Sequence, residues 1–191
     1  MLVIFKYFLL VKKICIKDEM INMYTKKTIH VGSFNITTNI MYISDPCYKY
    51  GGFGSQQLPC LHGRYIGSVV MYSGKDIGTR VGEILAVHSA FKTVKATKLP
   101  NERLYIDSGQ LGYFDASYYE QNNPGGILNI FKGPSEWYKR VSEITSTGKC
   151  TGIIDDKGFV SESGGMDGEF KYYLGTNPSG INVSFRVVFI E

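Results

Sequence analysis

Apolar and polar residues alternate along much of the chain in the way that short β-strands do. Residues 181–190 show this best, with apolar side chains at every odd position from Ile181 to Phe189 and polar ones at most positions between. A repeat of two residues places alternate side chains on opposite faces of a strand, so this segment is predicted to be half buried. Residues 80–91 fit a strand, although their apolar spacing also fits one face of a helix. Further strands are predicted over residues 28–36, 39–43, 64–72, 104–106, 152–155, 158–161 and 170–174.

Two segments carry the signals of short helices instead. Ser135 can cap a helix over residues 135–145, where an acidic residue in the first turn suits the helix dipole and apolar residues line one face. Asp115 can cap a second helix over residues 115–121. Loops are predicted at two segments rich in glycine, proline or asparagine, which are residues 48–59 and 122–126.

The composition agrees with this division between strands and helices. The 191 residues include 14 Tyr, 11 Phe and 22 Gly, and 43% of them are hydrophobic. Aromatic residues favour strands, and abundant glycine between short apolar runs favours many turns. We therefore expect a single, mainly β domain over residues 28–191. It is of the α+β type with one or two short helices, built as an antiparallel sandwich or a partly closed barrel.

Residues 1–27 are expected to lie outside this domain. Residues 1–11 form an apolar run that is interrupted by Lys6 and is too short for a membrane-spanning helix, which needs about 20 residues. Three interpretations stay open: a weak membrane anchor, a signal-like segment, or a start codon upstream of the true one, because Met20 and Met23 precede the domain. Contact with a membrane is expected only if residues 1–13 are a true anchor.

The charge distribution and the cysteine content indicate which kinds of partner and which cellular compartment the domain suits. The net charge is +4, but residues 1–27 hold six lysines and two acidic residues, so the remaining 164 residues carry 15 basic and 15 acidic side chains. A balanced domain disfavours nucleic acid as a partner. The four cysteines form no CxxC pair and no zinc spacing, which favours reduced thiols in the cytoplasm and predicts no metal site and no cofactor.

Acidic residues at the ends of predicted strands are the candidates for chemistry. Asp45, Asp107 and Asp115, with His88 as a general base, could form the centre of an Asp-based hydrolase or a metal-assisted enzyme. The candidate ligand-binding residues nearby are Ser108, Gln110 and Asp167. The alternative for each aspartate is a turn, in which the carboxylate accepts a bond from the backbone two residues on. His88 could equally be a hydrogen-bonded core residue.

A cysteine nucleophile is a weaker hypothesis. Cys47 follows Pro46, and His88 is the only histidine that could serve as its base. The chain lacks a phosphate-binding loop, a GxGxxG motif and a GxSxG motif.

Three stretches together resemble a family of uncharacterised proteins from bacteria and their phages. They are the Ser44-Asp45-Pro46-Cys47-Tyr48 sequence, residues 80–88 and residues 107–115. Residues 163–170 are similar to that family's Ser-Gly-x-Gly-Asp-Gly-x-Tyr turn and keep Asp167-Gly168, but carry Met166 and Phe170 where Gly and Tyr are usual. The resemblance implies a cytosolic domain in which Asp45, Asp107, Asp115 and Asp167 belong to one pattern. It transfers no activity.

The function expected from these observations is a small cytosolic binding or regulatory module, of phage or bacterial origin, acting on an unknown protein or small ligand. Such a module should expose aromatic side chains in the loop at residues 48–53 or around residues 113–119. The first alternative is the Asp-based or metal-assisted enzyme. The second is a structural or virion component, which should present long unprotected strand edges.

Overall fold

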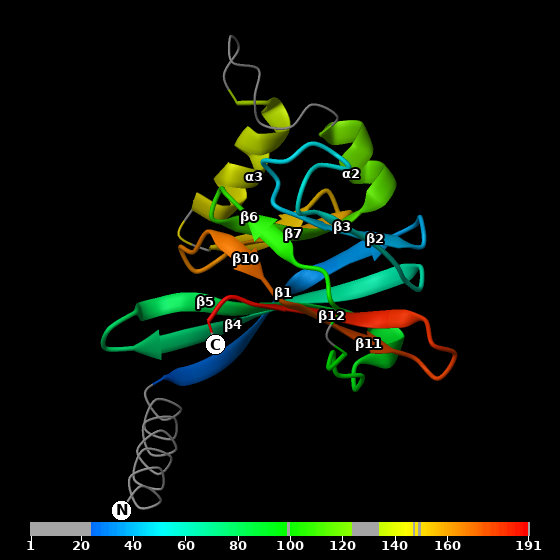
Figure 1. Cartoon of the computed structure of the whole chain (residues 1–191), viewed down its shortest axis with the longest axis horizontal. Helices are drawn as coiled ribbons and strands as arrows, with labels where there is room; N and C mark the ends of the chain where they lie inside the picture. Colours follow the sequence, from blue (N-terminus) through cyan, green and yellow to red (C-terminus); the bar gives the residue numbers. More distant parts are fainter. Residues whose placement is uncertain (1–23, 99, 124–133, 147, 149, 191) are drawn as a thin grey trace, which may run out of the picture.

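Two antiparallel sheets packed face to face make up most of the molecule (Figure 1). The computed structural model describes residues 24–98, 100–123, 134–146, 148 and 150–190. Within these residues each main sheet has five strands, and a third, two-stranded sheet lies beside them. The expected mainly β fold and antiparallel sandwich are confirmed, and the sheets do not close into a barrel.

The first sheet, called sheet A, has the strand order β1-β4-β5-β12-β11. Its strands are β1 (Thr25–Ile36), β4 (Gly63–Gly74), β5 (Gly78–His88), β12 (Asn182–Val188) and β11 (Tyr172–Thr176). The second, sheet B, has the order β3-β2-β7-β9-β8. Its strands are β3 (Gln56–Pro59), β2 (Ile40–Ser44), β7 (Gln110–Asp115), β9 (Gly158–Glu162) and β8 (Thr151–Ile154). The small sheet pairs β6 (Leu104–Ile106) with β10 (Gly168–Phe170).

Aromatic side chains from both main sheets fill the space between them. Phe159 of β9 lies between Phe34 of β1 and Tyr113 of β7, with ring centroids 6.4 and 6.1 Å away. The buried Tyr113 hydroxyl donates to the Ile84 carbonyl of β5, 3.1 Å away, which ties the two sheets together. Burial of this apolar surface is the main stabilising contribution to the fold.

A second apolar cluster lies on the opposite face of sheet B, beneath two helices (Figure 1). These are α2 (Ala116–Asn122) and α3 (Glu136–Ser146). Trp137 of α3 packs against Phe114 of β7 and Tyr119 of α2 at 5.5 and 5.3 Å between ring centroids. Strand β7 is therefore buried on both faces, so its residues do not alternate between apolar and polar. For this reason the sequence pattern did not predict this strand.

Both helix starts were predicted correctly. The Asp115 carboxylate accepts from the first turn of α2, and the Ser135 hydroxyl accepts from the Tyr138 amide of α3 at 3.2 Å. Residues 80–91 are a strand that ends in a 3₁₀ turn, Ser89–Phe91, rather than a helix. The prediction was wrong for residues 56–59, which form β3, and for residues 170–174, which are split between two sheets. Strand β1 begins at Thr25, before the expected boundary at residue 28.

We predict that Phe159→Ala lowers the free energy of unfolding by about 3–5 kcal/mol, because it leaves a cavity between the sheets. The measurement is urea unfolding followed by the fluorescence of Trp137, the only tryptophan in the chain. The control is Phe53→Ala, since Phe53 is 74% exposed and its removal should change stability by less than about 0.5 kcal/mol. Equal effects of the two substitutions would contradict this packing.

Candidate functional site: the Asp45 corner and its aromatic surface

Asp45 follows β2 and is completely buried, and its carboxylate fastens two loops together. One oxygen accepts from the Cys47 amide at 2.8 Å and from the Ser108 hydroxyl at 2.6 Å. The other accepts from the amides of Asp107 and Ser108 at 2.8 and 2.7 Å. The bond to Cys47 is the expected turn, two residues on, and the bonds from the loop after β6 are additional. Four donors compensate the cost of burying the carboxylate.

Asp107 and Asp167 meet at the same corner. In the small sheet, Ile106 pairs with Gly168. Because the two strands are antiparallel, Asp107, which follows Ile106, comes next to Asp167, which precedes Gly168. A Cβ atom built on Gly109 would lie 3.9 Å from the Asp167 Oδ1. Both of these aspartates are exposed, in contrast to Asp45. The segments that carry Asp45, Asp107 and Asp167 are therefore neighbours at this corner.

The neighbouring Cys47 and Tyr48 are held in their protonated forms. Burial raises the pKa of the Cys47 thiol, and the charges of Asp45 and Asp107 raise it further. Burial also raises the pKa of the Tyr48 hydroxyl, followed by its interaction with the Asp107 carboxylate. A nucleophilic cysteine needs a thiolate, so this environment opposes covalent catalysis by Cys47.

Asp115 lies away from this corner and has a different structural role. One carboxylate oxygen caps α2 by accepting from the Ser117 and Tyr118 amides at 3.1 and 3.2 Å. The other accepts from the Thr37 hydroxyl at 2.8 Å and from the amides of Thr37 and Thr38. Burial alone raises the pKa of Asp115, but these hydrogen bonds outweigh it and lower the pKa below its ordinary value of 3.8.

His88 belongs to sheet A, and both of its ring nitrogens are engaged. The Nδ1 atom accepts from the Ala90 amide at 3.2 Å, so the Nε2 atom carries the proton and donates to the His62 carbonyl at 3.2 Å. The ring lies edge-on against Tyr65, 5.2 Å between centroids. The observed arrangement is that of a hydrogen-bonded core histidine, and no contact joins it to the aspartates among the described residues.

The remaining ligand candidates have mixed placements. Ser108 is part of the corner through its bond to Asp45. Gln110 lies under α3, where its amide nitrogen is 3.4 Å from the Ser142 hydroxyl and its buried carbonyl oxygen has no partner among the described residues. In the described part of the chain, no three His, Cys, Asp or Glu side chains converge in a way that could hold a metal ion.

An aromatic surface adjoins the corner, and the sequence predicted only part of it. Phe53, the most exposed large apolar residue described, lies in the expected loop and packs against Tyr105 of β6 with ring centroids 4.7 Å apart. Tyr105 alternates with the buried Leu104 and Ile106, so the two-residue period places Tyr105 on the outer face of β6, and Asp107 follows this strand as an exposed residue. That alternation was the available signal for Tyr105.

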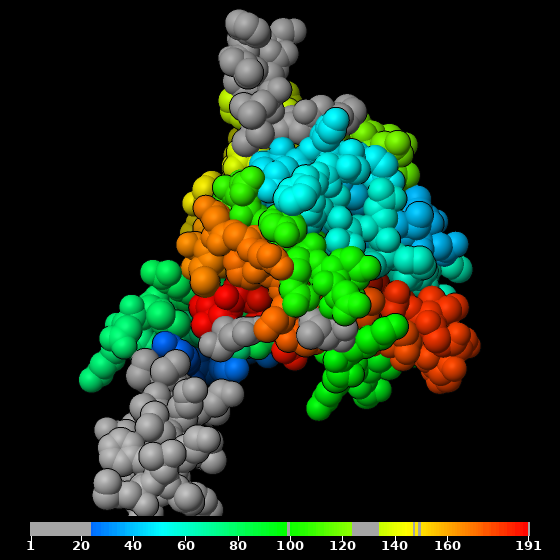
Figure 2. Space-filling view, viewed as in Figure 1, coloured from blue at the N-terminus to red at the C-terminus, as the bar shows by residue number. Residues whose placement is uncertain are grey.

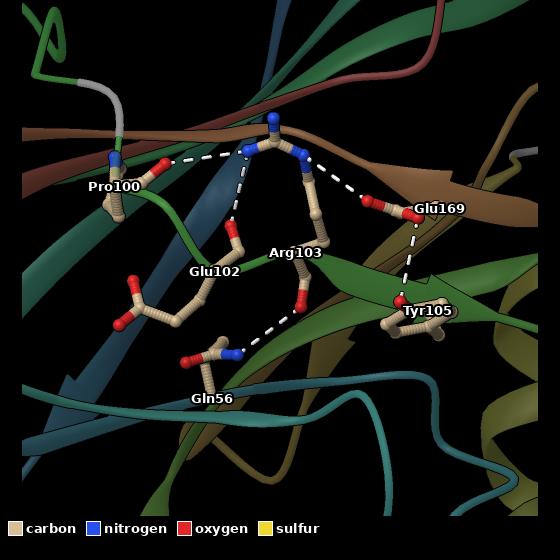
Figure 3. A network of polar contacts seen from close by, with 6 residues as sticks. All are labelled: Gln56, Pro100, Glu102, Arg103, Tyr105 and Glu169. Carbon is tan, nitrogen blue, oxygen red and sulfur yellow. Dashed lines mark hydrogen bonds and ion pairs between the residues drawn. The ribbon is translucent and has the colours of Figure 1, made fainter.

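A polar network holds this aromatic surface in place (Figure 3). The Arg103 guanidinium forms an ion pair with Glu169 at 3.3 Å and donates to the carbonyls of Pro100 and Glu102 at 3.4 Å. The Tyr105 hydroxyl donates to Glu169 at 3.5 Å. From the other side, the Gln56 amide donates to the Arg103 carbonyl at 3.3 Å. The residues beneath Phe53 are thus fixed in position by both backbone and side-chain contacts.

The loop before β3, strand β6 and strand β10 form one continuous face in cyan, green and orange (Figure 2). We name the following outward-facing residues of this face the corner surface: Tyr48, Phe53, Tyr105, Asp107, Asp167 and Glu169.

Comparison with known proteins gives no family for this chain. No family model matches it, and neither the curated proteins nor the solved structures contain a match. None of the described helices has the length and apolar character needed to cross a membrane.

We predict that Asp45→Ala destabilises the protein by about 3 kcal/mol, because it leaves the amides of Cys47, Asp107 and Ser108 without their acceptor. Urea unfolding measures the loss. Ser108→Ala, which removes a single donor to the same carboxylate, should cost about 1 kcal/mol. If Asp45→Ala were neutral, the corner would not depend on this carboxylate.

The lowered pKa of Asp115 predicts a specific dependence on pH. Its ionised form is favoured by folding, so its contribution is fully present above its unfolded pKa, near 4, and is lost as the pH falls through the lower folded pKa. Asp115→Asn should therefore cost about 2 kcal/mol at pH 7 and progressively less in acid. Urea unfolding at a series of pH values between neutral and strongly acidic checks this. A cost that stays constant with pH would contradict it.

Proposed function

We propose that this protein is a small cytosolic binding module, of bacterial or phage origin, whose corner surface captures a protein segment. The observation that carries the proposal is Phe53, which is 74% exposed and rests on Tyr105. Aromatic side chains anchor protein interfaces because they bury a large area and lose little conformational entropy. The exposed part of the Phe53 side chain is apolar area that a partner could bury.

The rigidity of the loop that carries Phe53 supports this proposal. The Gly51 amide donates to the Tyr42 hydroxyl at 2.9 Å, and the Tyr119 hydroxyl donates to the Tyr48 carbonyl at 2.7 Å. The Gly54 carbonyl accepts from the Tyr105 amide at 3.2 Å. A loop held at both ends presents its side chain at a smaller entropic cost on binding.

The charges of the corner surface indicate which partner it suits. Asp107 directly follows and Asp167 directly precedes the last residue pair of the small sheet, Ile106 and Gly168, so two exposed acidic residues lie at the same edge. A lysine or arginine side chain of a partner would be attracted to this edge. The proposed partner is therefore a segment in which a basic residue lies next to an apolar one that contacts Phe53.

The same contacts weigh against the enzyme hypothesis. The Asp45 carboxylate is completely buried with four donors, and the His88 ring nitrogens are both in use. A general acid or base needs a free lone pair or proton within reach of a substrate. The virion hypothesis expects open strand edges, but the edge strand β1 carries Lys26 and Lys27, which discourage pairing with another strand.

A selection from a random peptide library with the full chain as bait tests the proposal. We expect enriched peptides with a basic residue beside an apolar one, and Phe53→Ser should weaken their binding at least about tenfold in Kd. Ile181→Ser is the matched control, because Ile181 is 39% exposed and lies in the turn region before β12. Enrichment that Phe53→Ser leaves unchanged, or peptides without basic residues, would refute the proposal.

A further inference from the structure

Three exposed lysines lie on a short segment that crosses the outer side of sheet A. We name residues 92–98 the lysine strap, and its Lys92, Lys95 and Lys98 recur at every third position. The strap begins after the 3₁₀ turn Ser89–Phe91 and lies below β11 in Figure 1, on the side of sheet A away from sheet B. Other basic side chains form ion pairs with carboxylates, whereas no described residue does so with these three lysines. The strap therefore carries positive charge that the described part of its own chain does not neutralise.

The backbone of the strap is fixed against β11. The Thr97 and Lys98 amides donate to the Leu174 carbonyl at 3.1 and 2.9 Å, and the Leu174 amide donates to the Lys98 carbonyl at 2.8 Å. Leu174 faces the core, so the adjacent Gly175 faces outward, and a Cβ atom there would lie 2.5 Å from the Lys95 carbonyl oxygen. Because this backbone is already ordered, the strap can bind a partner at a low cost in conformational entropy.

The strap and the corner surface lie at opposite ends of one pair of chain segments. Lys98 pairs with Leu174, and Ile106 pairs with Gly168 beside the corner surface. Leu174 and Gly168 are six residues apart, which corresponds to about 20 Å of extended chain. Charges at this separation are largely screened, since the Debye length is about 8 Å at physiological ionic strength. Lys98 therefore does not neutralise the acidic residues of its own corner surface.

We propose that the partner of the corner surface is a second copy of this chain, which presents its lysine strap. This inference rests on the proposed function, because it names the partner of the same site. That site calls for a basic residue next to an apolar one, and the start of the strap provides two such pairs, Phe91-Lys92 and Val94-Lys95. Phe91 and Val94 are half-buried, so each leaves apolar area that the Phe53 side chain can cover.

The charges of the two surfaces are complementary. The corner surface contains three carboxylates and no basic side chain, and one of these carboxylates, Glu169, already pairs with Arg103. The other two belong to Asp107 and Asp167, which are exposed, although Asp107 also interacts with the Tyr48 hydroxyl. Surfaces of opposite charge attract each other and orient the two copies as they approach.

The proposed contact joins the copies head to tail, because the strap and the corner surface are different surfaces. Each copy then keeps one free strap or one free corner surface, so further copies can add to form a ring or a chain. Exposed ion pairs contribute little individually and are screened by salt. The association should therefore be weak and should decrease as the ionic strength rises.

Sedimentation equilibrium of the full chain, with one variant of each surface, tests the proposal. The strap variant is Lys92→Ser/Lys95→Ser, and the corner variant is Asp107→Asn/Asp167→Asn. At low ionic strength the mean mass of the unaltered chain should rise with protein concentration up to about 1 mM, and either variant alone should associate at least about tenfold more weakly in Kd. An equimolar mixture of the two variants should form a one-to-one complex and nothing larger, because each pair contains one intact strap and one intact corner surface.

The matched control is Lys27→Ser/Lys75→Ser, which removes the same charge from exposed lysines of β1 and of the turn between β4 and β5. It should associate like the unaltered chain, and all variants should keep the circular dichroism spectrum of that chain. A monomeric unaltered chain would overturn the proposal, as would equal losses in the strap variant and the control, or a mixture without the one-to-one complex. A monomeric chain whose Phe53 still binds selected peptides would leave the proposed function in place with a foreign partner. Peptide binding that does not depend on Phe53 would refute the proposed function itself.

Discussion

The buried carboxylate of Asp45 is the interaction on which the rest of this corner depends. It joins the end of β2 to the loop between β6 and β7 by accepting backbone donors from both. These loops are far apart in the sequence, and the strands that they border, β2 and β7, pair with each other as far as Ser44 and Gly112. A charged acceptor can bind several amides at once, whereas a neutral side chain of the same size could not. This carboxylate fixes the Asp107 amide at the corner, in addition to the pairing of the neighbouring Ile106 with Gly168.

Helix α2 extends the same support across sheet B. Asp115 caps its start, so the helix holds Tyr119 and Asn123 at fixed positions. The Tyr119 hydroxyl shares its proton between the carbonyls of Tyr48 and Asp45, at 2.7 and 3.1 Å, and the Asn123 amide donates to the carbonyls of Pro46 and Tyr48. The Trp137 indole donates to the Pro46 carbonyl as well. Two buried carboxylates thus order the loop that presents Phe53, one directly and one through a helix.

The sequence was informative wherever local rules decide the structure. Alternation predicted the last strand, and capping predicted both helix starts, because these signals act within a few residues. Alternation did not predict strand β7, because this strand is buried on both faces, and burial on both faces depends on the tertiary arrangement. The sequence suggested that four aspartates share a site; Asp45, Asp107 and Asp167 lie on neighbouring segments, whereas Asp115 binds Thr37 and caps α2. Nothing in the sequence indicated that Arg103 and Glu169 would pair beneath Tyr105.

The aspartates divide by what their oxygens already bind. Asp45 and Asp115 are buried, and each carboxylate accepts several hydrogen bonds. Their lone pairs are therefore occupied by contacts that stabilise the fold. Asp107 and Asp167 are exposed at the edge of the small sheet. Only carboxylates of the second kind are accessible to a new partner, and of these Asp107 also interacts with the Tyr48 hydroxyl. The proposed recognition therefore involves the exposed aspartates and the aromatic residues beside them, and the two buried carboxylates hold the loops on which they lie.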